Sequence, residues 1–538
     1  MGNRVKAIVI DALAREHGRR IVTIDVIGSG PRAVAGLLKA KGIKADIYPA
    51  EEVIEDPWIL GNYDIMLVSA MTCDKPVARR LLRLWRKHSY GASIIGGPIA
   101  IEYKECLRMG YSYVVYGEGE VVLPKLLDCI QKKYECSDVK GLAYLRDDTV
   151  VFTGKPRYAL REELAYMHST DITNYPIYWA ARVYVEVVRG CSNFRRPKWT
   201  SWGIKCCECG RCESPRLSDR LSCPLGIPAG CGYCSVPALY GPARSRPLDI
   251  IVREVRELVK RGATRIVLSA PDVLDYGRDE VVYPEPLTDP CNPPARVDKI
   301  EELLQTLYDE VNEFYTKDAY LLIENVKACL VDERVAKVLS KYLRGTPVHI
   351  GVESGDDNLL RRIGRPSLTS DVRRAVKLLS KAGLEPYVYF IYGLPGETSE
   401  SIKKTIEFMR ELVKLGATKI TVYRFRALPG TAFQGHSSKP SEESRAILKE
   451  AIKLNEMVKR RIIGHRIECI VAGIHPVKNK LVCYPLPHGP VTLINGDKSL
   501  IGYRVLVRIV DVLSDRMLLG IVLSKISKIA DKPFKPIT

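Results

Sequence analysis

Eight of the chain's sixteen cysteines fall within residues 189–234, a stretch shorter than a tenth of its 538 residues. Several of them are separated by only two residues, a spacing that turns both thiolates of a pair toward one point. Such thiols indicate metal ligands when a chain has no secretory pattern, and disulfides when it has one. Because the amino terminus leads directly into a strand-like run, we predict a metal centre within residues 189–234.

These cysteines form two groups. Cys231 and Cys234 follow an apolar, strand-like run at 183–188 that leads into Arg189-Gly190-Cys191. The second group comprises Cys206 or Cys207, Cys209, Cys212 and Cys223. Three cysteines at two-residue gaps with a distal Cys-Pro are typical of a bacterial ferredoxin, although the distal gap is longer here. Four thiolates suit zinc as well.

A strand that leads into Arg-Gly-Cys, followed by a later Cys-x-aromatic-Cys, resembles the start of a radical S-adenosylmethionine enzyme. The resemblance implies a 4Fe-4S cluster on three cysteines, whose fourth iron binds S-adenosylmethionine and whose electron cleaves it to a 5′-deoxyadenosyl radical. Cys231 and Cys234 match two ligands, and we favour Cys191 as the third. In a rival assignment Cys223 is the third ligand and Cys191 belongs to the second centre. Residues 192–230 are then an insertion with a second 4Fe-4S cluster, a zinc ion, or a zinc knuckle without redox role.

Strand and helix patterns alternate through residues 183–434, which predicts the partial (β/α)6 barrel of this superfamily. The later strands are expected at 265–269, 319–323, 348–352, 387–392 and 419–423. By resemblance, the expected S-adenosylmethionine contacts are Tyr233, Asp272, Glu353, Ser354, Gly393, Pro395 and Gly396. Asp272 stands where most members carry Gly-Gly-Glu, and it either accepts from the methionine ammonium or caps a turn. Glu324 and Asn325 end the third strand and either touch a ligand or are structural.

Residues 1–130 show the same alternation and predict a doubly wound parallel α/β sheet. Glycine turns at 28–30, 96–98 and 117–120 fall at strand ends, where such sheets bind ligands. These turns resemble the cobalamin-binding domain that precedes many radical S-adenosylmethionine cores. Its Asp-x-His-x-x-Gly signature is absent, since the first histidine after Asp11 is His17. Cobalamin therefore binds without a histidine lower ligand, or the domain is a docking layer.

The remaining segments are a connector at 131–182, a linker helix at 435–459, a β domain at 460–525 and a basic tail at 526–538. Short β runs separated by Gly or Pro predict that residues 460–525 form a small all-β barrel. The end of this domain resembles the TRAM domain of tRNA methylthiotransferases. Arg504 and Arg508 are its candidate RNA contacts.

Charge and composition bear on the partner. Lys and Arg outnumber Asp and Glu by 82 to 63, which suits a polyanion such as RNA or an anionic membrane surface. No run of eighteen apolar residues is present, so we expect a cytoplasmic chain without a transmembrane segment.

Together these features predict an archaeal-type radical S-adenosylmethionine enzyme that transfers a methyl or methylthio group to RNA and receives electrons from a ferredoxin or reductase. One alternative is carbon–carbon bond formation or methylation on an archaeal membrane lipid. A second is an iron–sulfur RNA-binding protein without enzymatic activity.

Overall fold

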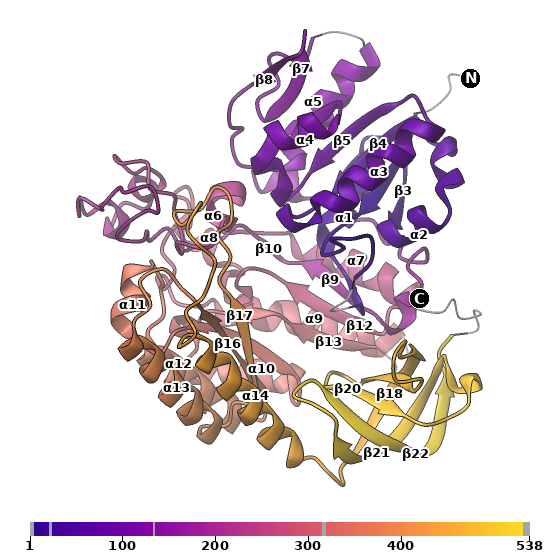
Figure 1. The fold of residues 1–538 in the computed structure, drawn as a ribbon, viewed down its shortest axis with the longest axis vertical. Coiled ribbons are helices and arrows are strands. Elements are labelled where there is room, and N and C mark those ends of the chain that lie inside the picture. Colours follow the sequence, from indigo (N-terminus) through magenta and orange to yellow (C-terminus); the bar gives the residue numbers. More distant parts are fainter. Residues whose placement is uncertain (1–4, 21–23, 133–134, 315–318, 531–538) are drawn as a thin grey trace.

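The computed structural model describes residues 5–20, 24–132, 135–314 and 319–530. The chain forms an N-terminal α/β unit, a central α/β unit and a C-terminal β barrel, with the central unit between the other two (Figure 1).

The N-terminal unit is built on a seven-stranded sheet in the order β3-β1-β4-β5-β6-β7-β8. Its strands are β1 (Lys6–Asp11), β3 (Lys44–Pro49), β4 (Ile65–Ser69), β5 (Ala92–Gly96), β6 (Tyr113–Val115), β7 (Leu142–Arg146) and β8 (Thr149–Phe152). The first five are parallel, and β7 and β8 are antiparallel. The hairpin β7–β8 belongs to the segment expected as a connector. Its strand β7 pairs with β6 and so extends the sheet at that edge.

Helices cover both faces of this sheet. One face is covered by α1 (Ser29–Ala40) and α5 (Gly119–Lys132). The other face is covered by α2 (Ala50–Glu55), α3 (Lys75–His88) and α4 (Tyr103–Met109). In β1, Ala7 and Val9 pack toward the first pair, whereas Ile8 and Ile10 pack toward the other three. This alternation within one strand, apolar on both faces, is typical of a parallel sheet buried on both sides.

The central unit contains the six expected strands. They are β9 (Arg182–Glu186), β12 (Arg265–Ser269), β13 (Tyr320–Ile323) continuing as β14 (Asn325–Val326), β15 (Pro347–Glu353), β16 (Glu385–Tyr392) and β17 (Lys419–Arg424). All of these pairings are parallel. The third strand is interrupted at Glu324, and β2 (Val26–Ile27) from the N-terminal segment adds to the edge of β9.

The outer helices of this unit are α7 (Leu248–Lys260), α9 (Val297–Phe314), α10 (Glu333–Leu343), α12 (Thr369–Lys381), α13 (Ser399–Lys414) and α14 (Arg445–Arg460). Short elements at the loops are β10 (Val188–Arg189), β11 (Arg244–Ser245), α6 (Val236–Tyr240), α8 (Arg278–Val282) and α11 (Asp357–Arg362). The insertion 192–230 contains only the short turns η6 (Arg211–Glu213) and η7 (Leu217–Leu221) and forms an irregular lobe beside α6 and α8 (Figure 1).

The C-terminal unit is a closed five-stranded barrel, β18-β19-β20-β22-β21. Its strands are β18 (Arg466–Ile474), β19 (Leu481–Pro485), β20 (Val491–Ile494), β21 (Tyr503–Val512) and β22 (Met517–Lys528). The last strand therefore extends into the segment expected as a tail, whose residues 531–538 lie outside the described range. The barrel packs below the central sheet, where the Arg265 guanidinium lies 5.3 Å from the Tyr484 ring centroid. Arg265 begins β12, so the barrel covers the amino-terminal edge of the core strands.

The N-terminal unit is docked on the core through buried ionic contacts. Arg32 of α1 donates to the carboxylate of Glu254 at 2.6 Å and to the carbonyl oxygens of Ser169 and Tyr184, both at 2.7 Å. Gly36 of the same helix lies so close to the backbone of Met167 that an added Cβ would be 2.4 Å from its carbonyl oxygen. Removing one partner of a buried ion pair costs roughly 3–5 kcal/mol of stability. Another arrangement of the two units would separate Arg32 from Glu254, so this interface has one preferred geometry.

Candidate active site

Three cysteines of the predicted metal stretch come together at the carboxyl edge of the core sheet. The backbone N–H of Asn193 donates to Cys191 Sγ at 3.4 Å, and its side-chain amide donates to Cys231 Sγ at 3.3 Å. Burial, then the neighbouring thiols of Cys231 and Cys191, raise the pKa of Cys234 to about 12. The structure thus brings Cys191 together with Cys231 and Cys234.

The other cysteines lie in the insertion. Cys206 and Cys223 pack at its base, against an apolar cluster that includes Phe433. Cys212 Sγ accepts from Arg196 at 3.3 Å. Cys209 is exposed, and its pKa is lowered first by the backbone of Arg211 and then by the thiol of Cys207.

Within the described ranges, no three His, Cys, Asp or Glu side chains surround one point as a single metal ion requires. In a 4Fe-4S cluster the thiolates bind different irons, so cluster ligands need not converge in that way.

Arg365 and Glu353 lie beside Cys231. Arg365 donates to Cys231 Sγ at 3.6 Å and to the Gly351 carbonyl oxygen at 2.6 Å, and it lies 3.6 Å from the Glu353 carboxylate. Glu353 has φ +70°, a left-handed conformation that is uncommon for a non-glycine residue. Such strain persists where surrounding contacts impose it and is concentrated at functional sites. Burial raises the pKa of Glu353, and Arg365 opposes that shift.

Lys327 is a buried cation in the same region. Its Nζ donates to Ser192 Oγ at 2.9 Å and to the carboxylates of Asp272 and Asp275, both at 2.8 Å. Asp272 also accepts from the backbone N–H groups of Leu274 and Lys327. Its carboxylate is therefore occupied by this network as well as by a turn cap, and a substrate ammonium at Asp272 has to compete with Lys327.

The remaining predicted contacts lie in tight turns. Ser354 Oγ lies 3.1 Å from Thr405 Oγ1 of α13, so its hydroxyl is engaged within the fold. The Gly393 N–H donates to the Glu397 carboxylate at 3.2 Å, which folds the turn that also contains Pro395. Gly396 has φ +82°, and an added Cβ would lie 3.2 Å from the Trp199 ring of the insertion.

Tyr233 lies on the loop between two of the gathered cysteines. Gly232 beside it donates to the Ile363 carbonyl oxygen at 2.9 Å and accepts from the Phe433 N–H at 3.0 Å. An added Cβ at Gly232 would be 2.5 Å from the Phe433 ring, so only glycine fits. Burial raises the pKa of Tyr233 well above its usual range. This loop is therefore fixed by the core on both sides.

A cavity of about 370 Å³ lies between the N-terminal sheet and the core. Residues at the carboxyl ends of the N-terminal strands line it, including Leu13, Ser69 and all three glycine turns. On the core side it is lined by residues beside the gathered cysteines, including Gly190 and Val236. The volume is within the range of cofactor pockets.

Arg189 links this cavity to the cysteines. It pairs with Glu118 at 3.2 Å, Glu120 at 3.1 Å and Glu186 at 2.6 Å. Arg244 adds a second pair to Glu118 at 3.0 Å. The Gly-Glu-Gly-Glu turn of the N-terminal unit is thus tied to the strand end that carries Cys191. Sequence reasoning missed the functional roles of Arg189, Asn193, Lys327 and Arg365, because only the tertiary structure brings them to the cysteines.

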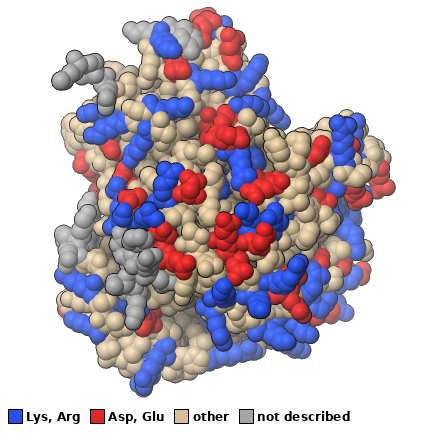
Figure 2. Space-filling model, turned by 180° about the vertical axis from the view of Figure 1, so that it is seen from behind, with Lys and Arg blue, Asp and Glu red and all other residues tan. Residues whose placement is uncertain are grey.

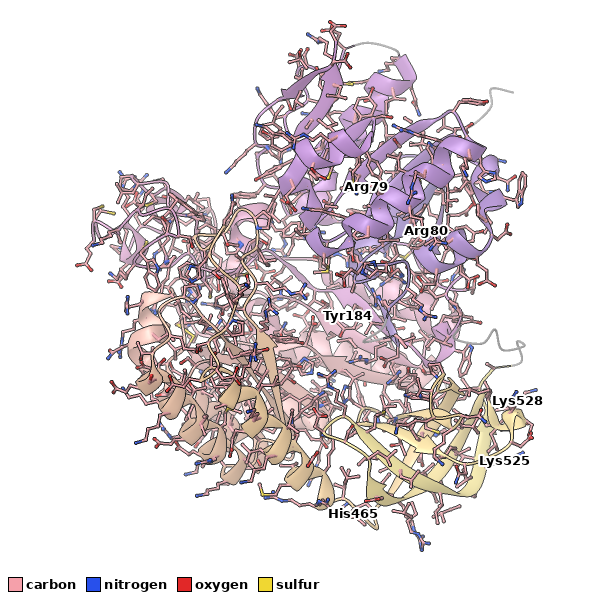
Figure 3. All side chains as sticks on the ribbon, in the orientation of Figure 1. Arg79, Arg80, Tyr184, His465, Lys525 and Lys528 are labelled. Carbon is pink, nitrogen blue, oxygen red and sulfur yellow. A yellow bond between two sulfur atoms is a disulfide. The ribbon has the colours of Figure 1, made fainter. Side chains whose placement is uncertain are left out.

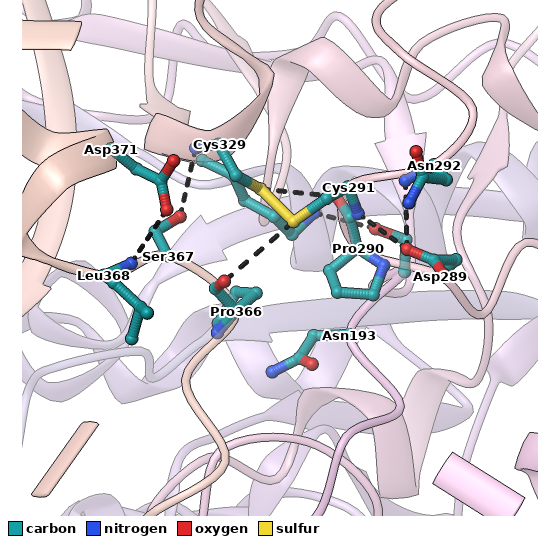
Figure 4. Close-up of a disulfide and its surroundings, with 12 residues drawn as sticks. Asn193, Asp289, Pro290, Cys291, Asn292, Cys329, Pro366, Ser367, Leu368 and Asp371 are labelled. Atoms are coloured by element: carbon teal, nitrogen blue, oxygen red, sulfur yellow. Dashed lines mark hydrogen bonds between the residues drawn. A yellow bond between two sulfur atoms is a disulfide. The ribbon is translucent and has the colours of Figure 1, made fainter. Parts of the chain in front are cut away.

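A disulfide lies close to this site. Cys291 and Cys329 are bonded, and Cys329 N–H donates to Ser367 Oγ at 3.1 Å (Figure 4). Asn193 lies beside this bridge in the same view. The bridge joins the loop before α9 to the segment that follows β14, and no sequence pattern indicated it.

The Radical SAM superfamily matches residues 222–409. An uncharacterized protein of Methanopyrus kandleri is 42% identical over 524 residues, which cover 95% of each chain. Ribosomal protein uS12 methylthiotransferase RimO of Chlamydia felis is 25% identical over 49% of this chain and 55% of its own length. Threonylcarbamoyladenosine tRNA methylthiotransferase MtaB of Thermotoga maritima is 27% identical over 46% of this chain and 55% of its own.

Among solved structures, the radical S-adenosylmethionine methyltransferase TsrM of Kitasatospora setae, with cobalamin and a 4Fe-4S cluster bound, has a TM-score of 0.57. It is 14% identical over 80% of this chain and 74% of its own, so the likeness concerns the fold. The match and the fold place a Radical SAM domain at residues 222–409. The chain belongs to the family of the Methanopyrus kandleri protein.

Among the described residues, no helix has both the length and the apolar character needed to cross a membrane.

Proposed function

We propose that this enzyme transfers a methyl or methylthio group to an unactivated carbon of RNA. The single observation that carries the radical chemistry is the gathering of Cys191, Cys231 and Cys234 at the carboxyl edge of the core sheet, beside Glu353 and the Gly393 turn. When bound there, a 4Fe-4S cluster supplies the electron that cleaves S-adenosylmethionine. Arg365 and Asn193 hold the Cys231 sulfur by hydrogen bonds.

Cobalamin is the proposed second cofactor, held in the 370 Å³ cavity. The cavity suits such a group, because its volume is that of a cofactor pocket and the glycine turns at the carboxyl ends of the N-terminal strands line it. Leu13, two residues after Asp11, lines the cavity and leaves no histidine in that place. When bound, cobalamin supplies a transferable methyl group, and a histidine-free site predicts a spectrum without a nitrogen lower ligand.

The insertion supports a second metal centre, which favours methylthio transfer as the second candidate. Its irregular chain contains five cysteines, Cys206, Cys207, Cys209, Cys212 and Cys223, none of which is in a disulfide.

RNA as the substrate rests on three features: the closed C-terminal β barrel, the net charge of +19 and the methylthiotransferase relatives. The names of those relatives specify a ribosomal protein in one case and a tRNA in the other. On the rear face, basic side chains are mixed with acidic ones (Figure 2). An RNA contact on that face therefore has to involve a local group of basic side chains.

The test compares nucleosides from RNA, and lipids, of a strain that lacks this protein with those of the parent strain. A methylated or methylthiolated nucleoside that disappears, and returns with the wild-type protein but not with Cys231→Ala, supports RNA. Unchanged nucleosides with an altered lipid would overturn it in favour of the membrane-lipid alternative.

A further inference from the structure

The inner face of the core sheet is open to solvent. Along β15, β16 and β17 the side chains that face the helices are buried, whereas Gly351, Tyr389, Thr421 and Tyr423 on the other face are partly or fully exposed. Tyr423 is 58% exposed although it lies within a strand. Tyr184 lies on β9, in the middle of the molecule (Figure 3). Because strand residues alternate between the two faces of a sheet, these exposed positions share one face.

Aromatic rings follow one another along this face. Tyr389 and Tyr423 have nearly parallel rings, 18° apart, with centroids separated by 6.0 Å. His349 lies 5.3 Å from Tyr389 and stacks on Tyr387 at 5.6 Å. Tyr387 in turn meets His488 of the C-terminal barrel at 5.5 Å. The barrel therefore closes the lower end of this row, and the rings at its upper end are left accessible.

Polar groups beside the rings are available to a ligand. Glu324 accepts from Ser269 Oγ at 2.8 Å through one carboxylate oxygen. Thr421 Oγ1 is buried and has no hydrogen-bond partner among the described residues. Burial raises the pKa of Glu324 to about 7, so this carboxyl group can donate as well as accept near neutral pH.

We infer that this face, defined by Tyr184, Glu324, Tyr389, Thr421 and Tyr423, binds the planar nitrogen heterocycle of the substrate, a nucleobase. The inference rests on the proposed function for the source of that ring. Stacking on an aromatic side chain contributes about 1–3 kcal/mol per base and tolerates any base, whereas a carboxyl group distinguishes ring edges by hydrogen bonding. A lipid chain would offer no polar partner to Thr421 Oγ1, and none to Glu324 beyond Ser269.

The face also lies next to the proposed radical site. Glu353 lies in register with Phe390 of β16, the residue after Tyr389, whose ring stacks with that of Tyr423. Glu353 lies 3.6 Å from Arg365, which bonds to Cys231. A base stacked at Tyr423 is therefore placed at the side of the sheet from which hydrogen abstraction occurs.

The experiment uses the full chain with its reconstituted cluster and measures saturation-transfer NMR of AMP, GMP, CMP and UMP. At least one nucleotide should show transfer to its base protons, and Tyr423→Ala should weaken that binding at least tenfold. Tyr389→Phe, which keeps the ring, should bind as the wild type does, and Tyr389→Leu should not. Tyr90→Ala, at a fully exposed tyrosine of the N-terminal unit, is the control. No transfer to any base in the wild type, or equal binding by Tyr423→Ala, overturns the inference.

The coupling of the reaction, which is the amount of modified RNA formed for each molecule of 5′-deoxyadenosine, gives a second readout. It separates this inference from the proposed function. With RNA substrate, Tyr423→Ala should still form 5′-deoxyadenosine but should yield at least tenfold less modified RNA for each molecule of it. If the wild type modifies RNA and Tyr423→Ala couples equally well, the face is not the base site while the function stands. If nucleotides bind at the face but the wild type modifies no RNA, the proposed function fails while the binding site stands.

Discussion

Asn193 bonds to two of the three gathered sulfurs, and this position was not recognised as functional from the sequence because it lies at an ordinary place in the insertion. Hydrogen bonds to cluster sulfurs stabilise the reduced, more negative state and raise the reduction potential. Asn193→Ala removes the bond to Cys231 while the backbone bond to Cys191 persists. We expect the midpoint potential of the reconstituted cluster to fall by on the order of tens of millivolts.

The measurement is an EPR-monitored redox titration with iron content determined in parallel. Asn292→Ala, at an exposed asparagine near the disulfide, is the matched control. An unchanged potential with a full iron content would show that the amide does not act on the cluster.

Glu324 gives a prediction for pH. Its folded-state pKa of about 7 is above its usual range, so between about pH 4.5 and 7 the folded state binds more protons than the unfolded state. This contribution to the free energy of unfolding is fully present below pH 4.5 and is lost as pH rises through 7. Glu324→Gln keeps the neutral shape at all pH values.

The variant should therefore have the same free energy of unfolding as the wild type near pH 5. At pH 8 its free energy of unfolding should be larger by roughly 1–3 kcal/mol. Melting temperatures across that range measure the difference. Glu55→Gln on α2, at an exposed carboxylate, serves as the control. A stability difference between Glu324→Gln and the wild type that does not vary with pH would contradict a raised pKa at this residue.

At the element scale, the insertion shows which features the local sequence predicts and which depend on tertiary structure. Its cysteine spacing predicts a second metal centre, which stays a prediction. Its fold could not be predicted, since it has only short turns and few buried side chains. Its tip is stabilised by neither a helix nor an apolar core. A bound metal would supply the missing free energy.

We expect roughly eight irons per chain after anaerobic reconstitution if both centres are 4Fe-4S clusters. Cys209→Ser with Cys212→Ser should lower the iron content to roughly four and should increase proteolysis within residues 206–223, while 5′-deoxyadenosine formation persists. Cys73→Ser, at an unbridged cysteine of the N-terminal unit, is the control, and Cys207→Ser distinguishes Cys206 from Cys207 as ligand. Iron content near eight in the double variant would show that these thiols do not hold a cluster.

The disulfide between Cys291 and Cys329 is a second element-scale feature. It closes a loop of 38 residues between the segment before α9 and the segment after β14. Restricting the unfolded chain in this way contributes roughly 3–4 kcal/mol. Cys291→Ser, Cys329→Ser and the double variant should therefore share a similar loss of thermal stability.

Differential scanning calorimetry measures that loss, with Cys73→Ser, at an unbridged cysteine, as the control. Additive losses in the double variant would indicate that the two cysteines act separately and are not bonded.

At the scale of the whole molecule, the alternation of strand and helix patterns predicted the doubly wound sheet and the six core strands, and the short β runs predicted the small barrel. Tertiary contacts account for what it missed. The β7–β8 hairpin joins a sheet whose edge lies earlier in the chain, and the Gly-Glu-Gly-Glu turn binds Arg189 of another unit. Likewise Arg504, a candidate RNA contact, donates to Glu468 and to Tyr320 Oη of the core, and the local sequence did not indicate these two bonds.

The last prediction concerns how the barrel meets RNA. Deleting residues 460–538 would expose the core residues that pack against the barrel, such as Trp179, so point variants are the better test. Arg466 and Arg508 lie directly opposite each other on β18 and β21 and are exposed, close to His465 and on the same unit as Lys525 and Lys528 (Figure 3). Among the described residues, no carboxylate forms an ion pair with either arginine. Like charges opposite one another destabilise a sheet, which favours an anion between them.

If that anion is an RNA phosphate, Arg466→Gln with Arg508→Gln should weaken tRNA binding on the order of 10- to 100-fold at low salt. The slope of log affinity against log salt should fall by about two, because two phosphate contacts no longer release counterions. Filter binding at several salt concentrations measures both quantities. Arg334→Gln with Lys337→Gln, on α10 of the central unit, removes the same charge outside the barrel and should change neither. Equal affinities and slopes for the two double variants would mean that the barrel's arginine pair does not contact RNA, because a general loss of positive charge would then explain the whole effect.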